Sequence, residues 1–292
     1  MTTNYLDPDV LARIRHLEFS ARQIVEGIMS GEHRSPRHGF AVEFAHHREY
    51  VPGDDVKHVD WKVFGRTERY YLKQYELETD LTAWFVIDTS ASMRYSSHNV
   101  SKYDYAALLA ASLAHLVIRQ SDRIGFVALD NAIRRFLRTS GSGAQVPEMI
   151  RLLTEGPGQE PSQIGTALSE VASRLGRRSV VLIFSDFLDE PAELAAGLRR
   201  IRFDRHEVIA VQVLDPAEED FPFSAATLFR GMEIPEELLT DPRGLRRAYL
   251  AEVEAHRHAL RHTCHELDIH LLEVRTDADP GLTLARYLAT KR

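Results

Sequence analysis

The chain has 292 residues, of which 44% are hydrophobic and 27% are charged, and both fractions are ordinary for a globular protein. Its net charge of −7 disfavours nucleic acid as a partner, because binding to phosphates needs a basic surface. The single cysteine, Cys264, excludes an intramolecular disulfide and a zinc site built from a cysteine cluster. Such cysteine usage is typical of a reducing compartment, so we expect a cytoplasmic protein.

The sequence gives no signal for export or membrane insertion. The first residues lack the basic start and the apolar block of a signal peptide. The longest apolar-rich stretch, Ala106–Ile118, is interrupted by polar residues and is shorter than the about 20 residues of a transmembrane helix. We therefore expect no membrane span.

The first 80 residues differ in pattern from the rest of the chain. Residues 7–29 carry apolar side chains at helical spacing, which predicts an amphipathic helix. Residues 39–76 combine alternating and aromatic positions with a Pro-Gly-Asp-Asp turn at 52–55, which predicts a small strand-rich segment linked by polar loops. We assign residues 1–80 to this N-terminal part.

Residues 81–292 alternate between short apolar runs and helical patterns. The predicted strands are Ala83–Ile87, Ile124–Leu129, Val180–Phe184, Val208–Leu214 and Ile269–Val274. The predicted helices are Tyr103–Arg119, Val146–Leu153, Ile164–Leu175, Ala192–Ile201 and Arg243–Leu267. This alternation predicts an α/β fold with a doubly wound, mostly parallel sheet and helices on both faces. We also expect an antiparallel edge strand at Ile133–Arg138 and a long loop at Asp215–Thr240 over one end of the sheet.

Acidic residues follow four of these strands, at the edge where ligands of parallel sheets bind. They are Asp88, Asp130, Asp186 and Asp215. Asp88 opens an Asp-x-Ser-x-Ser string with Ser90 and Ser92, whose alternate oxygens can converge on a hard cation such as Mg²⁺. Asp186 can add a second carboxylate, and Ser162 or Thr166 a further hydroxyl. The competing interpretation is that Asp88 and the serines cap the next helix.

The residues Asp88-Thr-Ser90-Ala-Ser92, Ser162 and Ser185-Asp186 together resemble the metal-ion-dependent adhesion site (MIDAS) of von Willebrand factor A-type (vWA) domains. This resemblance implies a divalent ion, Mg²⁺ or Mn²⁺, bound by Asp88, Ser90, Ser92, Ser162 and Asp186. Ser162 stands where that pattern has a threonine, and Thr166 is the alternative ligand from the second loop.

The segment before residue 81 extends the resemblance. The string from Arg48 to Trp61 is similar to that of the bacterial family called domain of unknown function 58 (DUF58), in which it leads into a vWA domain. Membership would imply a MoxR-type AAA+ ATPase as partner, and a role in protein assembly, maturation or metal insertion. In one interpretation the acidic residues Asp54, Asp55 and Asp60 face a basic partner. In the other, which is favoured, Arg48 pairs internally with Asp54 or Asp60.

Other candidate sites are weaker. On a wheel of the last long helix, Leu260 and Cys264 fall on the apolar stripe and the histidines 258, 262 and 265 on the opposite face. A solvated polar face is favoured over a metal site for these histidines, and a buried Cys264 thiol is unreactive. Arginine clusters at 134–138 and 199–205 are typical of solvated element ends.

Two functions remain after this comparison. The first is a non-catalytic protein-binding module, in which the ion bridges to a carboxylate of a partner. The alternative is a Mg²⁺-dependent phosphatase or phosphotransfer enzyme with Asp88 as nucleophile. Against the enzyme, Ser90 stands where a general acid would be expected, and no lysine is obviously placed to neutralise a phosphate.

Overall fold

The chain divides into two compact units, one of which is formed by His33–Asp80. The computed structural model describes residues 42–49, 61–67, 69–77, 81–176, 178–233 and 235–290. The helix predicted at residues 7–29 lies outside these ranges, as do the turn at 52–55 and the acidic residues Asp54, Asp55 and Asp60.

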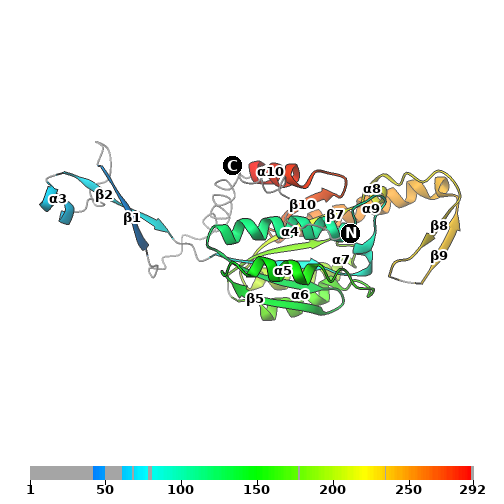
Figure 1. Cartoon of the computed structure of the whole chain (residues 1–292). Coiled ribbons are helices and arrows are strands. Elements are labelled where there is room, and N and C mark those ends of the chain that lie inside the picture. The colour runs from blue at the N-terminus through cyan, green and yellow to red at the C-terminus, as the bar shows by residue number, and fades with distance from the viewer. Residues whose placement is uncertain are drawn as a thin grey trace. The chain divides into compact units, whose positions relative to one another are not determined.

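The smaller unit contains an antiparallel pair of strands, β1 (Val42–Glu49) and β2 (Tyr71–Leu77) (Figure 1). This confirms the expectation of strands in the segment. The stretch between the strands was expected to be polar loop, but it contains the helix α3 (Trp61–Thr67). The ring of Phe64 from this helix stacks on Tyr70 with their centroids 4.5 Å apart, a contact that loop-like composition does not reveal.

The larger unit is built on a six-stranded sheet with the order β10-β7-β6-β3-β4-β5. The strands are β3 (Thr82–Asp88), β4 (Arg123–Leu129), β5 (Ile133–Ser140), β6 (Val180–Ser185), β7 (Glu207–Leu214) and β10 (His270–Arg275). All neighbours in this sheet pair in parallel except β4 and β5, which confirms the antiparallel edge strand. The predicted fold class, a doubly wound and mostly parallel sheet, is confirmed.

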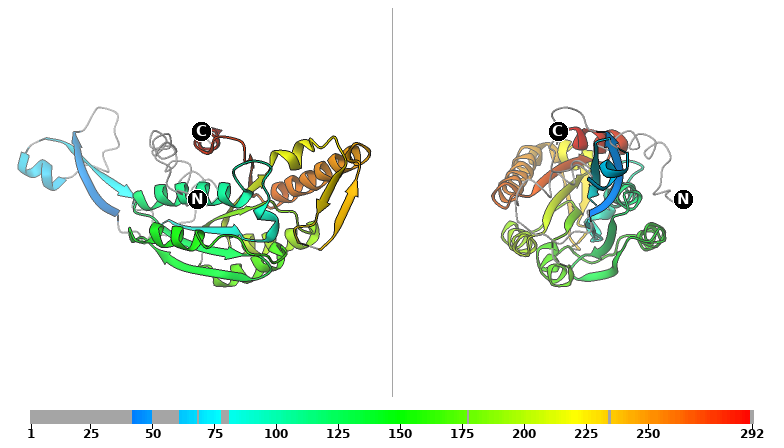
Figure 2. Two further views of the ribbon diagram at one scale, coloured as in Figure 1. Left: turned by 45° about the vertical axis from the view of Figure 1, so that its right-hand side comes forward. Right: turned by 90° about the vertical axis from the view of Figure 1, so that its left-hand side faces the viewer.

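Helices cover both faces of the sheet (Figure 2). One face carries α4 (Lys102–Arg119), α5 (Gln145–Leu153) and α10 (Pro280–Thr290), and the other carries α6 (Ile164–Arg174), α7 (Pro191–Phe203) and α9 (Pro242–Glu266). The sequence predicted α4, α5, α6, α7 and α9, but it did not predict α10.

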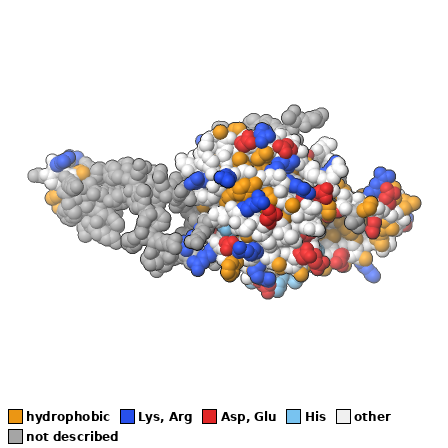
Figure 3. All heavy atoms as spheres, turned by 90° about the horizontal axis from the view of Figure 1, so that it is seen from below, with side chains coloured by type: hydrophobic (Ala, Val, Ile, Leu, Met, Phe, Trp, Pro, Cys, Tyr) orange, Lys and Arg blue, Asp and Glu red, His pale blue; other side chains and the backbone are white. Residues whose placement is uncertain are grey.

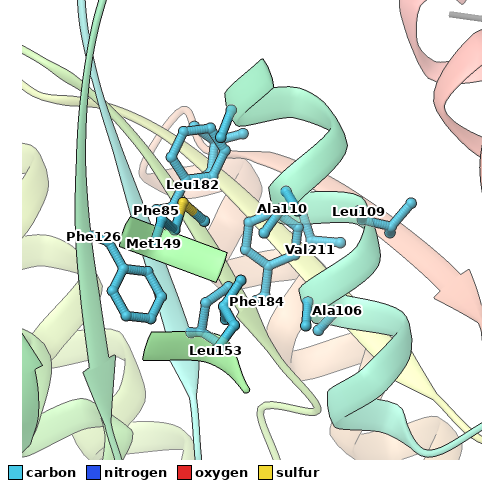
Figure 4. Packing of buried hydrophobic residues seen from close by; sticks show 14 of the residues in the cluster. Phe85, Ala106, Leu109, Ala110, Phe126, Met149, Leu153, Leu182, Phe184 and Val211 are labelled. Carbon is cyan, nitrogen blue, oxygen red and sulfur yellow. The ribbon is translucent and has the colours of Figure 1, made fainter. Parts of the chain in front are cut away.

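The core has two layers because successive side chains of a strand point to opposite faces. Phe85 of β3 and Phe184 of β6 pack under α4 with their ring centroids 6.5 Å apart (Figure 4). Their neighbours in sequence, Val86 and Ile183, belong to the layer on the opposite face. Strands buried on both faces are near-continuous apolar runs, which is why composition alone located them.

The segment Asp215–Thr240 is not the plain loop that was expected. It forms the short helix α8 (Pro216–Asp220) and a hairpin of β8 (Thr227–Arg230) and β9 (Glu237–Thr240). Asp215 caps α8 through a capping box with Glu218, and this pattern precedes a helix too short to show apolar periodicity.

Aromatic contacts hold this segment together. The ring centroid of Phe221 lies 5.7 Å from that of Phe229 in β8 and 4.5 Å from that of Tyr249 in α9, so Phe221 links the hairpin to α9. On the outer side the hairpin exposes hydrophobic residues, including Leu239 at 71%. Hydrophobic side chains are interspersed with positive and negative ones over the face of the molecule that Figure 3 shows.

The last long helix, α9, has the orientation that the sequence predicts. Leu260 and Cys264 are buried, whereas the histidines 258, 262 and 265 are exposed. Within the described residues, no helix is both long and apolar enough to cross a lipid bilayer.

Candidate functional site

The candidate site lies where the winding of the sheet reverses. The chain leaves β3 toward β4 on one side, whereas β6 leads to β7 on the other, and β3 and β6 are neighbours. Doubly wound sheets bind ligands at this switch point, beyond the carboxyl ends of the two strands. Asp88 is the last residue of β3 and Asp186 directly follows β6, so the fold brings these two carboxylates together.

Asp88 is fully buried and held by two donors. The backbone N–H of Ser90 donates to its Oδ1 at 2.8 Å, and the hydroxyl of Ser185 donates to its Oδ2 at 2.6 Å. Burial and the nearby charge of Asp186 raise the pKa of Asp88 to about 7. Two buried carboxylates in this proximity repel each other, and a bound cation would relieve that repulsion.

The two serines of the Asp-x-Ser-x-Ser string complete the cluster. The hydroxyl oxygens of Ser90 and Ser92 lie 3.1 Å apart, and Ser92 is hydrogen-bonded to Asp186. The one-turn 3-10 helix Ala91–Arg94 that follows has no side-chain cap, and Ser101 caps α4 by accepting from the N–H of Asp104 at 3.0 Å. The capping interpretation of this string is therefore wrong for α4.

Ser162 lies in the loop between α5 and α6, and this loop contacts the Asp-x-Ser-x-Ser string. The carbonyl of Glu160 in the same loop accepts from the N–H of Ala91 at 2.9 Å, and the N–H of Gly158 donates to the carbonyl of Thr89. Ser162 is half-buried in this loop, whereas the alternative ligand Thr166 is exposed in the first turn of α6. Four of the five predicted ligands thus form one linked cluster, and the fifth stands on the adjoining loop.

The other two acidic residues at this edge of the sheet, Asp130 and Asp215, have separate roles. Asp130 forms an ion pair with Arg134, whose Nε lies 2.8 Å from Oδ1 and 2.7 Å from Oδ2 of the carboxylate. Asp215 caps α8 and also accepts from the backbone N–H of Ser97 at 2.9 Å. Neither was assigned as a ligand, and both carboxylates are engaged elsewhere.

The structure brings a lysine to the site that sequence reasoning missed. Lys102, the first residue of α4, is fully buried, and its Nζ lies 2.7 Å from Asp186 Oδ2 and 2.6 Å from Glu218 Oε1. Burial disfavours the charge of Lys102, but the two carboxylates outweigh burial and raise its pKa. Burial likewise opposes the charge of Asp186, but Lys102 holds the pKa of that carboxyl below its ordinary value.

Sequence reasoning found no lysine placed to neutralise a phosphate at this site, but the structure places Lys102 beside Asp186. A lysine in the first turn of a helix interacts unfavourably with the helix dipole. This unusual position was the one signal in the sequence that Lys102 has a special role. The partners of Lys102 lie 84 and 116 residues away in sequence, so they could not be identified without the fold.

The donor set suits a hard divalent cation. Its atoms are carboxylate and hydroxyl oxygens, the ligands that Mg²⁺ and Mn²⁺ prefer. Gln212 on β7 donates from its Nε2 to the backbone carbonyl of Asp186 at 3.1 Å, and its buried amide oxygen has no hydrogen-bond partner among the described residues. In the described ranges, no three side chains from His, Cys, Asp and Glu cluster as a metal site, so an ion held here would need the serine hydroxyls as ligands.

The larger unit is thus an α/β domain with a buried, oxygen-lined acidic site at its switch point. A family model described as "Protein of unknown function DUF58" matches residues 46–259. The chain belongs to this DUF58 family, as its resemblance predicted.

Relatives in the family extend over nearly the full chain. Uncharacterized proteins of Mycobacterium bovis and Mycobacterium tuberculosis are each 30% identical over 291 residues, spanning 98% of this chain and 91% of the relative.

Solved structures to which this chain is similar share little sequence with it. An aerotolerance-related membrane protein from Bacteroides fragilis is 14% identical, with a TM-score of 0.46 over 72% of this chain and 99% of its own. The VWA domain of SpRpn10 is 9% identical, with a TM-score of 0.43 over 71% of this chain and 95% of its own. The doubly wound fold itself follows from the strand order.

Proposed function

We propose that this protein is a non-catalytic, metal-dependent protein-binding module. In this proposal Asp88, Ser90, Ser92, Ser162 and Asp186 hold one Mg²⁺ or Mn²⁺ ion at a MIDAS-type site, and a carboxylate of a partner completes its coordination. The observation that carries the proposal is the pairing of Asp88 and Asp186 at the switch point with the serine hydroxyls beside them.

The engagement of the reactive groups favours binding over catalysis. A nucleophilic Asp88 must reach the phosphorus atom of a substrate directly, but its side chain is fully buried. Lys102, the cation that could neutralise a phosphate, is already paired with two carboxylates.

The proposed partner is a MoxR-type AAA+ ATPase or its client, and the proposed setting is protein assembly or maturation in the cytoplasm. Family membership supports this part of the proposal through the resemblance described above. A single carboxylate–metal bond across the interface would make the interaction directional and dependent on the ion.

Calorimetric titration with MnCl₂ tests the metal site first. We expect the wild-type protein to bind one ion and Asp88→Ala to bind none while retaining its circular dichroism spectrum. Asp130→Asn is the matched control, because it also removes a carboxylate at this edge of the sheet. This variant should bind Mn²⁺ as the wild type does. Equal binding by the wild type and Asp88→Ala contradicts the site.

Capture of the partner protein tests the second part of the proposal, the bridging of two proteins by the ion. We expect a MoxR-type ATPase to be encoded beside the gene. The immobilised wild-type protein should retain this ATPase in Mg²⁺ and release it in EDTA. Retention that survives both EDTA and Asp88→Ala would show that the ion does not bridge the two proteins.

A further inference from the structure

Lys102 places a permanent positive charge inside the candidate metal site. Its Nζ lies 2.7 Å from Oδ2 of Asp186, one of the two carboxylates that the site offers to an ion. Because the lysine side chain is fully buried, little solvent screens this charge. Asp186 cannot take up a metal ion without bringing a second cation close to the ammonium group.

Glu218 gives the same ammonium group a second partner. Its Oε1 lies 2.6 Å from Lys102 Nζ, and its Oε2 accepts from the backbone N–H of Asp215 at 2.9 Å. Glu218 is therefore held in place by the capping box of α8, independently of Lys102. A buried ammonium left unpaired would be costly, but this arrangement keeps Lys102 paired when Asp186 turns to another cation.

We propose that Lys102 is a resident counter-ion that competes with the divalent ion for Asp186 and thereby lowers the metal affinity of the site. Glu218 is the alternative partner that makes the exchange possible. This inference rests on the proposed metal site and adds to it the residue that sets how tightly the ion is held. Lys102 is a positioning residue here, because it acts on the ion through Asp186.

Two variants change the charge at this point in opposite directions. Lys102→Met removes the competing cation with little change in side-chain volume, so Mn²⁺ should bind at least about tenfold more tightly than to the wild type. Glu218→Gln preserves the shape of the α8 cap but leaves the ammonium to Asp186 alone, so Mn²⁺ should bind more weakly. A purely structural role for Lys102 would weaken binding in both variants.

Arg257→Met is the matched control for net charge. Arg257 on α9 is largely buried and pairs with Glu219 and Glu273, so this variant also removes one paired cation, but outside the site. Its Mn²⁺ affinity should equal that of the wild type. Calorimetry with Mn²⁺ gives the affinities, and thermal melting in EDTA and in Mn²⁺ gives an independent readout.

The melting experiment has its own expected sign. In EDTA, Lys102→Met should melt below the wild type because two buried carboxylates lose their counter-ion, and Mn²⁺ should raise its melting temperature by more than it raises that of the wild type. If Lys102→Met does not fold without the ion, Lys102→Gln replaces it, because glutamine removes the charge but keeps a donor for the two carboxylates, and Mn²⁺ should again bind more tightly than to the wild type.

The outcomes separate this inference from the metal site itself. Wild-type binding with unchanged or weaker binding by Lys102→Met overturns the inference and leaves the metal site standing. Undetectable binding by the wild type with clear binding by Lys102→Met supports it, since the lysine then occupies the place of the ion. Absence of binding in both proteins overturns the metal site and the inference together.

Discussion

The hydroxyl of Ser185 donates a hydrogen bond of 2.6 Å to Oδ2 of Asp88, joining the ends of two neighbouring strands across 97 residues of sequence. The same Ser185 oxygen accepts from the backbone N–H of Phe187 at 2.8 Å. Ser185 therefore fixes both the first carboxylate of the site and the turn that carries Asp186.

We expect Ser185→Ala to lower the free energy of unfolding by about 1–3 kcal/mol, because it removes a donor from a buried carboxylate. Urea unfolding curves measure this loss. Ser173→Ala is the control, since the hydroxyl of Ser173 bonds only its own helix at an exposed position. Equal losses of unfolding free energy in the two variants would mean that the Ser185–Asp88 hydrogen bond contributes no more to stability than an exposed hydroxyl does.

Asp88 should make the metal-free protein less stable as pH rises from about 4 to about 7. The pKa of Asp88 is raised from 3.8 to about 7 in the folded state, so over this range the unfolded chain releases a proton that the folded chain retains. The burial of Glu218 also raises its pKa and acts in the same direction.

Asp88→Asn should therefore flatten the pH dependence without abolishing it, because Glu218 still contributes. The measurement is the free energy of unfolding in EDTA at several pH values. A pH dependence that is the same in the wild type and in Asp88→Asn would refute the assigned direction.

Helices α6 and α7 approach closely at two glycines. A Cβ placed on Gly197 would lie 2.3 Å from the carbonyl oxygen of Gly165, and one on Gly165 would lie 2.4 Å from that of Glu193. We expect Gly197→Ala to destabilise the protein by about 1–3 kcal/mol, because both obstacles are backbone atoms and the helices must move apart.

Gly244→Ala in α9 is the comparison for this effect. A Cβ there meets no atom within 4 Å, so alanine should be neutral or slightly stabilising through its higher helix propensity. Thermal melting of both variants distinguishes the close approach from a general effect of replacing glycine.

The thiol of Cys264 should be unreactive in the folded protein. Only 1% of the residue is exposed, and burial raises the pKa of its thiol to about 12. Reaction with a chromogenic disulfide reagent at pH 8 should be slow in buffer and complete in denaturant. Rapid reaction of the native protein would place Cys264 at the surface, contrary to its position on the buried stripe of α9.

The phosphatase alternative makes a distinct prediction. The structure supplies the lysine that this reaction was thought to lack, but Lys102 and Asp88 are both engaged and buried. With a generic phosphate ester and Mg²⁺ we therefore expect no turnover above that of Asp88→Asn. Turnover that the substitution abolishes would establish the enzyme and displace the binding module.

Local sequence was sufficient for much of the fold. The sheet strands are buried on both faces, so each is a continuous apolar run, and the helices between them repeat every three or four residues. The hairpin of β8 and β9 and the helix α8 escaped prediction because they are too short to show a period.

The sequence by itself determined the strands of the sheet and the acidic loop. Asp88, Ser90 and Ser92 lie within five consecutive residues, so one turn sets their geometry. Only the tertiary structure decided what surrounds that loop. Lys102 meets Glu218, and Gln212 meets Asp186, because the parallel sheet aligns strand ends from distant parts of the chain. A buried charge depends on its neighbours in space, and those neighbours are chosen by the winding of the sheet rather than by any local pattern.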